Sequence, residues 1–324
     1  MSRFLVATAC VAAAAVGPSA VLAQSTYTEV GSYARPSNTL AIGPDGLLWA
    51  LNGTEVLRQA AINSATFDVV GSLNAGGSVL SISPDGTRLV VVDGTTVRAA
   101  LISSLSTSSS TATINSTVPG GRFRDGVAWT GNNLLVGVAT PFGGPGVPAT
   151  SQILRLDFGT GLTPAITVAA SIDGSGTQGG SIGVGLGRVY WTPQTGGGDS
   201  SRTRGYDLAT LLASPTPLGD SPTDIRPFIS QSFTGVDGNG AVIVGDVRSG
   251  MAVAIAYNPA TGASILDFSS AFGFPIGYNS TTGELLIAES RIGRGSLVVR
   301  YSIPAPGFGA ALLIGGLAVA RRRR

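Results

Sequence analysis

Aspartate, glutamate and arginine are the charged side chains that could do chemistry in this chain, because the sequence contains no histidine and no lysine. Those absences exclude Ser-His-Asp triads, histidine metal ligands and lysine Schiff bases. Carboxylates can still act as general acids and bases, or supply the oxygen ligands of a calcium ion. The acids that we consider for such a role are Asp125, Asp246 and Glu289.

A dedicated calcium loop is not indicated. Asp237-Gly238-Asn239-Gly240 looks like the start of one, but no acid stands at the twelfth position of that loop. We interpret the segment as a turn. Cys10 is the only cysteine, so a thiolate site in the body of the protein is also excluded. We assign no catalytic residue and no metal ligand, and we expect no cofactor unless calcium binds through the acids named above.

A repeat of 40 residues indicates the fold that must position the charged residues. The segment EVGSYARPSNTLAIGPDGLLWAL, from Glu29, aligns without gaps on VVGSLNAGGSVLSISPDGTRLVVV, from Val69. Eight identities fall within 17 positions, and they include a complete Pro-Asp-Gly turn. A period near this length with short strands and tight turns is typical of a β-propeller, in which each repeat is one four-stranded blade.

The repeat predicts an all-β, six-bladed propeller over residues 24–302. Looser copies of the hairpin begin at Val127, Ile182, Thr234 and Pro275. The fourth unit should find its fourth strand near residues 216–220, whereas the sixth unit has none. The segment TYTEVGSY, from Thr26, is expected to close the ring by pairing with the last blade, which removes an exposed sheet edge. A five- or seven-bladed ring and a two-sheet sandwich remain alternatives.

The strand order places the turns of such a propeller on two faces. Turns between first and second strands lie on one face, which we call the Pro-Asp-Gly face. The opposite face carries loops of varied length, where binding residues are expected. The candidate ligand-binding residues there are Arg35, Arg124, Asp125, Gln178, Asp246, Arg248, Glu289 and Arg291. The alternative is that these charges only pair with one another at the surface.

The beginning of the chain is predicted to be a secretory signal peptide. Residues 1–23 combine Arg3, an apolar stretch and small residues before Gln24. Acylation of Cys10 is the alternative. Residues 24–307 then carry 15 arginines and 18 acids, a formal charge of −3, so no nucleic-acid partner is inferred.

The last segment, residues 303–324, is predicted to be a sorting or anchor segment with a short apolar helix. It contains Pro304-Ala305-Pro306, an apolar run over residues 308–320 and four terminal arginines. As a helix the run covers roughly 20 Å, against about 30 Å for a bilayer core. This order of features resembles the PEP-CTERM sorting signal of Gram-negative bacteria, with alanine where that family usually has glutamate. The resemblance implies transient contact with the inner membrane, cleavage by an exosortase-like protease, and release to the cell surface or an exopolysaccharide matrix. A retained anchor is the alternative.

The Pro-Asp-Gly hairpins resemble those of extracellular NHL, YVTN and gluconolactonase-like propellers. The resemblance to gluconolactonase-like propellers implies a calcium ion in the channel, held in part by a glutamate of an early inner strand. The inner strand TLAIG, from Thr39, contains no glutamate. We therefore predict an exported, non-catalytic binding module for a glycan or protein partner, such as an exopolysaccharide or a surface protein. Signal peptidase and the exosortase-like protease are its expected processing partners. The alternative is a calcium-dependent, carboxylate-based hydrolase or lyase of the lactonase-like class.

Overall fold

The structure is a computed structural model of the chain. It describes residues 27–105, 112–115, 121–139, 150–173, 177–195, 203–219, 224–225, 230–236, 241–248, 251–257, 264–267, 272–291 and 293–303. The predicted signal peptide and the predicted apolar sorting helix lie outside these residues. In the described part, no helix is both long enough and apolar enough to cross a membrane.

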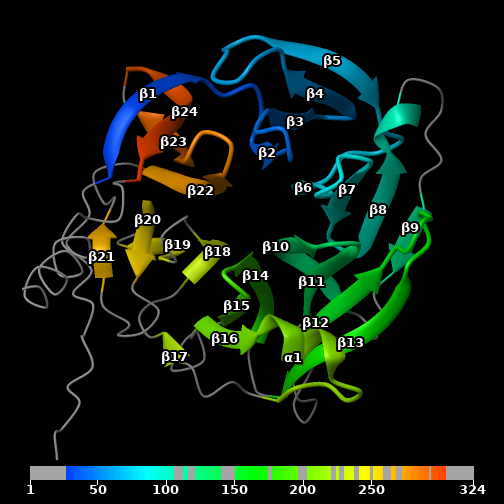
Figure 1. Cartoon of the computed structure of the whole chain (residues 1–324). Helices are drawn as coiled ribbons and strands as arrows, with labels where there is room; N and C mark the ends of the chain where they lie inside the picture. The colour runs from blue at the N-terminus through cyan, green and yellow to red at the C-terminus, as the bar shows by residue number, and fades with distance from the viewer. Residues whose placement is uncertain are drawn as a thin grey trace, which may run out of the picture. The chain divides into compact units, whose positions relative to one another are not determined.

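Antiparallel sheets of four strands make up the described body (Figure 1). Two neighbouring sheets are β2 (Thr39–Ile42), β3 (Leu48–Asn52), β4 (Glu55–Gln59), β5 (Phe67–Ser72), and β6 (Val79–Ile82), β7 (Arg88–Asp93), β8 (Thr96–Leu101), β9 (Ala112–Asn115). The next two are β10 (Arg122–Thr130), β11 (Asn133–Ala139), β12 (Thr150–Asp157), β13 (Ala165–Asp173), and β14 (Thr177–Gly185), β15 (Arg188–Thr195), β16 (Thr203–Asp207), β17 (Asp224–Ile225). The last two are β18 (Ser230–Val236), β19 (Val242–Arg248), β20 (Met251–Tyr257), β21 (Ser264–Asp267), and β22 (Phe272–Asn279), β23 (Glu284–Arg291), β24 (Gly295–Ser302) with β1 (Thr28–Ala34).

The repeated Pro-Asp-Gly segments form matched turns between the first two strands of their sheets. Gly46 and Gly86 have φ angles of 77° and 68°, a conformation that glycine adopts without a steric penalty. Asp45 Oδ1 accepts a hydrogen bond from the Leu47 amide at 3.0 Å, and Asp85 Oδ1 accepts one from the Thr87 amide at 3.0 Å. These aspartates therefore have the turn-stabilising role that their sequence context predicts.

The first strand of each sheet contacts the first strand of the next, from β2 through β6, β10, β14, β18 and β22 and back to β2. Apolar side chains fill the spaces between adjacent sheets. One such layer joins Leu51 and Leu89, and another joins Val97 and Leu134. This arrangement of sheets around common inner strands is a β-propeller, and it confirms the all-β propeller prediction at that level.

The N-terminal strand closes the ring, as predicted. β1 pairs antiparallel with β24, from Thr28 opposite Ser302 to Ala34 opposite Leu297, and Figure 1 shows the two strands side by side. A strand from the beginning of the chain thus completes a sheet whose other three strands come last.

The predicted ring of six full blades is wrong in its detail. Five sheets have four strands of at least four residues, but β17 in the remaining sheet has only two residues. The segment expected as its outer strand, residues 216–220, has another partner. Leu218 bridges to Ala170 of β13, donating its amide hydrogen to Ala169 O at 3.0 Å and accepting from the Ser171 amide at 2.8 Å. The described residues therefore form a propeller of five full blades and one reduced sheet.

A short helix interrupts the otherwise β structure of that reduced sheet. α1 spans Leu208–Ala213 between β16 and β17, with the Asp207 side chain accepting from the Thr210 amide at 2.8 Å and Leu211 buried beneath it. This N-cap lowers the pKa of Asp207, chiefly because the Thr210 amide stabilises the carboxylate. The all-β prediction missed this helix because one buried leucine gives no helical periodicity.

Candidate functional site

A cavity of about 740 Å³ lies among the inner strands, and we call it the channel. Its described lining comes from β2, β6, β10, β14, β22 and β23 and from residues that precede or follow some of these strands. Arg35, Asn38 and Ser78 line it toward the opposite face, whereas Pro44, Pro84 and Leu186 line it toward the Pro-Asp-Gly face. A volume of this size is typical of small-molecule pockets.

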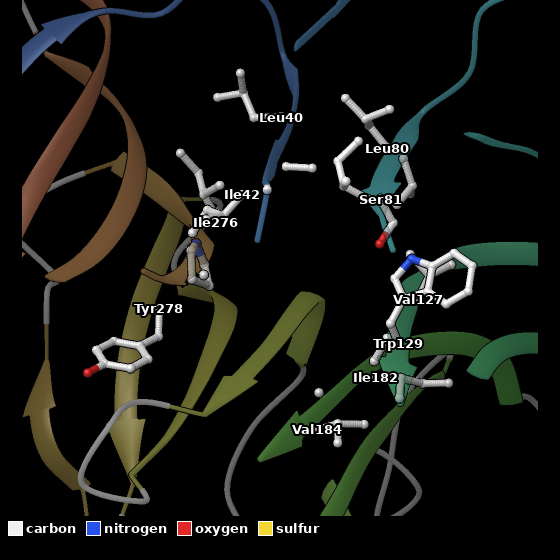
Figure 2. Close-up of a pocket in the computed structure, with 18 of the residues that line it drawn as sticks. Leu40, Ile42, Leu80, Ser81, Val127, Trp129, Ile182, Val184, Ile276 and Tyr278 are labelled. Carbon is white, nitrogen blue, oxygen red and sulfur yellow. The ribbon is translucent and has the colours of Figure 1, made fainter. Parts of the chain in front are cut away.

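The channel wall is mainly apolar. Figure 2 shows Leu40, Ile42 and Ile276 across the cavity from Leu80, Ser81 and Trp129. The indole Nε1 of Trp129 is buried and has no hydrogen-bond acceptor in the described part of the chain. A buried donor without an acceptor is costly to the fold.

A second cavity, of about 520 Å³, lies on the opposite face, and we call it the Arg35 pocket. Its lining consists of Arg35, Pro36, Ser37, Asn38, Thr39, Leu51, Asn52, Gly53, Gly76, Gly77 and Ser296. Arg35, Asn38 and Thr39 also line the channel, so the two cavities share a border. The connection from β1 to β2, the β3–β4 turn and the connection from β5 to β6 form most of this pocket.

Arg35 is fixed at this border by its backbone and its side chain. Its amide donates to Ser296 O at 3.0 Å, and its guanidinium Nη2 donates to Asn38 Oδ1 at 2.6 Å. Burial lowers the pKa of the Arg35 guanidinium, because desolvation disfavours the charged form, but an arginine in a protein stays charged. The pocket therefore presents a positive charge that is partly removed from water.

Two of the predicted ligand-binding residues, Glu289 and Arg291, lie together in a different environment. Glu289 is fully buried and accepts hydrogen bonds from the Tyr301 hydroxyl at 2.5 Å and from Arg291 Nε at 2.8 Å. Arg291 also donates to both carboxylate oxygens of Glu29, at 3.1 and 2.8 Å. These contacts raise the pKa of Arg291, mainly through Glu29, and burial together with Glu289 raises the pKa of Tyr301. We call these four residues the closure cluster, because they link β1, β23 and β24.

The remaining candidates are placed by their backbone positions. Arg124 and Asp125 lie in a register shift of β10 between Phe123 and Val127, and Gln178 begins a shift in β14 that ends at Ser181. Asp246 lies opposite Ser230, where a third shift begins in β18, and Arg248 lies opposite Met251. Irregular pairing of this kind redirects side chains and is common beside binding sites. The structure does not describe the side chains of these five residues, so their ligand-binding role stays a prediction.

The sequence predicted Arg35 as a ligand-binding residue, but it did not indicate the other residues of this pocket. Asn38 is the acceptor that orients the guanidinium, and a Cβ atom at Gly76 would lie 2.6 Å from Gly53 O. That clash shows why the pocket wall requires glycine there. The paired glycines of GGS, from Gly76, were the only signal in the sequence for this close approach.

The described lining of both cavities contains no aspartate and no glutamate. Among the described residues, no group of three or more His, Cys, Asp or Glu side chains is placed to hold a metal ion. In this part of the chain, the channel therefore offers hydroxyl, amide, indole and guanidinium groups to a ligand.

Solved structures with a similar fold include β-propeller domains. A luciferin-regenerating enzyme matches with a TM-score of 0.55 and 13% identity, covering 88% of this chain and 96% of that one. Regucalcin, a calcium-binding protein from Agrobacterium tumefaciens, matches at 0.54 and 14%, covering 82% and 91%. The β-propeller domain of Cps50 (Swd1) from Myceliophteria thermophila matches at 0.51 and 11%, covering 82% and 83%. No protein-family model and no curated protein matches the sequence. At these identities the similarities establish the fold alone, which is that of a β-propeller.

Proposed function

We propose that the protein is an exported, non-catalytic β-propeller that binds a glycan or a protein partner at the channel and the Arg35 pocket. The observation that carries this proposal is the chemistry of the two cavities. Their described lining combines apolar walls with hydroxyl and amide groups and one arginine, and it includes no carboxylate, histidine or thiol. Such a lining can bind and orient a ligand, but it supplies no general acid or base near neutral pH.

A glycan is the partner that these cavities fit better. Tyr278 and Trp129 line the channel, and aromatic side chains give sugars an apolar surface with a polar edge. Ser81 and Asn38 supply hydroxyl and amide groups in the lining of the same channel. A protein partner would instead need a broad surface, of about 800 Å² on each side, around the mouth of the channel.

Export and sorting form the second part of the proposal. It rests on the sequence of residues 1–23 and 303–324, which would be recognised by signal peptidase and by an exosortase-like protease after a transient inner-membrane stage. Intact-mass measurement of the protein from the cell surface tests it. A mature chain that starts at Gln24 and lacks Arg321–Arg324 is expected, and a surface form that keeps those arginines would overturn the sorting proposal.

The binding role is tested by titrating the purified full chain with oligosaccharides and measuring turnover of lactones, esters and phosphoesters in parallel. We expect saturable binding of at least one glycan and no turnover, with or without millimolar calcium. Turnover at ordinary enzymatic rates, about 1 s⁻¹ or more, would overturn the non-catalytic role. Turnover that requires calcium would establish the hydrolase alternative suggested by the acids Asp125, Asp246 and Glu289.

A further inference from the structure

The described arginines differ in whether they have a carboxylate partner. Six form ion pairs with carboxylates: Arg58 with Asp45, Arg88 with Asp85, Arg98 with Asp93, Arg155 with Asp157, Arg291 with Glu29 and Glu289, and Arg300 with Glu284. Among the described residues, Arg35, Arg122 and Arg294 have no carboxylate partner. All three lie at the opposite face: before β2, at the start of β10 and in the β23–β24 turn.

Arg35 differs from the other two because it lines a cavity and is partly buried. Arg122 and Arg294 are exposed to solvent, where water compensates their charge. The Arg35 guanidinium has lost part of that water, and its described partner is a neutral amide oxygen of Asn38. A charged group held in this way gains from an anion that enters the pocket.

We propose that the Arg35 pocket binds the carboxylate group of an acidic sugar. This inference rests on the proposed glycan-binding function and names the class of glycan. A guanidinium presents its N–H groups in a planar fork that matches both oxygens of a carboxylate. The bond to Asn38 uses Nη2 and fixes the plane of the fork, so the remaining donors are already oriented when the ligand arrives.

The rest of the pocket suits the hydroxyl groups of the same sugar. Asn38, Asn52 and Ser296 supply amide or hydroxyl groups, and the cavity of about 520 Å³ is large enough for a single sugar ring. Two described acids lie on the adjoining turns: Glu55, opposite Asn52, is exposed to solvent, and Asp93 is paired with Arg98 Nη1 at 3.3 Å. That arginine also donates to Gly76 O at 3.3 Å, so Asp93 does not leave an unpaired negative charge beside the pocket.

Backbone atoms form part of the pocket wall, where the connections on either side approach closely. Gly76 lies against Gly53 O, and Thr39 Oγ1 donates to Gly77 O at 3.4 Å, which joins the β5–β6 connection to β2. Ser37 Oγ accepts from the Thr39 amide at 3.1 Å and donates to Leu51 O. These bonds hold the three connections in place without a ligand, so the pocket exists before binding.

Calorimetric titration of the full chain with trigalacturonic acid, its methyl ester and maltotriose tests the proposal. The acid and the ester share one sugar skeleton and differ in charge. We expect the acid to bind at least tenfold more tightly than the ester. Arg35→Ala should weaken binding of the acid by about ten- to a hundredfold, to the level of the ester, and Arg35→Lys should cause a smaller loss because it keeps the charge without the planar fork.

Arg122→Ala is the matched control, since it removes the same charge from the same face but from a residue that lines neither cavity. It should leave the affinity for the acid unchanged, and each variant should keep the wild-type melting temperature. Equal affinity for acid and ester, equal losses in the Arg35 and Arg122 variants, or no binding of the acid would overturn the carboxylate site. If the acid binds no more tightly than the ester or maltotriose, and Arg35→Ala leaves all three affinities unchanged, the carboxylate site is overturned and the proposed glycan-binding function stands.

Discussion

Asp85 shows how one residue distinguishes two otherwise matched turns. Ser83 Oγ donates to Asp85 Oδ1 at 2.5 Å, the Thr87 amide donates to the same oxygen at 3.0 Å, and Arg88 Nη1 lies 3.4 Å from Oδ2. Together these donors, led by Ser83, lower the pKa of Asp85 to about 2. The matched turn has Gly43 where this one has Ser83, so it lacks the hydroxyl donor.

The lowered pKa predicts a defined pH dependence of stability. Because the folded state holds the Asp85 proton less tightly than the unfolded chain, the ionised form stabilises the fold fully above about pH 4, and this stabilisation is lost as the pH falls toward about 2. Urea unfolding of wild type and Asp85→Asn at several pH values should show a difference in free energy that shrinks over this window. Ser83→Gly, which copies Gly43, should make the total loss smaller and complete it at a higher pH, because the folded pKa of Asp85 then lies closer to the unfolded one. A difference that does not vary between pH 6 and pH 2.5 would contradict this account.

At the scale of elements, the closure cluster links the strand that closes the propeller to the last sheet. Glu289 is fully buried, and its described partners are Arg291 and Tyr301. Removing the arginine would leave a buried carboxylate without its counter-charge, which is far more costly than losing an exposed ion pair. Two predicted ligand-binding residues are thereby given a structural role.

Arg291→Met should therefore lower the free energy of unfolding by about 2 kcal/mol or more. Adding Glu289→Gln should recover most of the loss, because a neutral amide needs no counter-charge and its oxygen can still accept from Tyr301. Glu29→Gln, at the exposed side of the cluster, should cost less than about 1 kcal/mol. Chemical denaturation of wild type, Arg291→Met, the double variant and Glu29→Gln measures these free energies. A double variant no more stable than Arg291→Met would contradict the role of Arg291 as the counter-charge of Glu289.

The repeated elements could be predicted from the sequence, and the contacts between them could not. Pro-Asp-Gly fixes a turn locally, and the matching Val-Gly-Ser segments identified β1 as a strand equivalent to β5. Glu289 is hydrogen-bonded by Tyr301 of the next strand, and Leu218 is bridged to Ala170 of another sheet. No local sequence pattern predicts either contact. The Arg35 pocket was only partly foreseen, because Asn38, Gly53 and Gly76 come from separate connections.

At the scale of the whole molecule, the described body ends at a residue that still takes part in its core. Ile303 is partly buried and packs against the layer that contains Tyr27 and Tyr301. Residue 303, where the predicted tail begins, therefore contributes to the packing of the body.

A chain truncated after Ile303 should keep the melting temperature of the full chain. One truncated after Ser302 should be less stable by about 1 kcal/mol, since part of one isoleucine side chain is then no longer buried. Calorimetry of the two truncated proteins beside the full chain measures both. A large loss in the chain that keeps Ile303 would show that residues 304–324 stabilise the propeller body.

The pairing of β1 with β24 also sets an order for folding. Ser302 Oγ donates to Thr28 O across 274 residues of sequence, so the contact that closes the ring is among the most distant that the chain makes. Closing so long a loop is entropically costly, and contacts of this range form slowly. β1 is synthesised first, and its edge stays unpaired until β24 has also been synthesised. The earliest strand of the propeller is thus the last to find its partner.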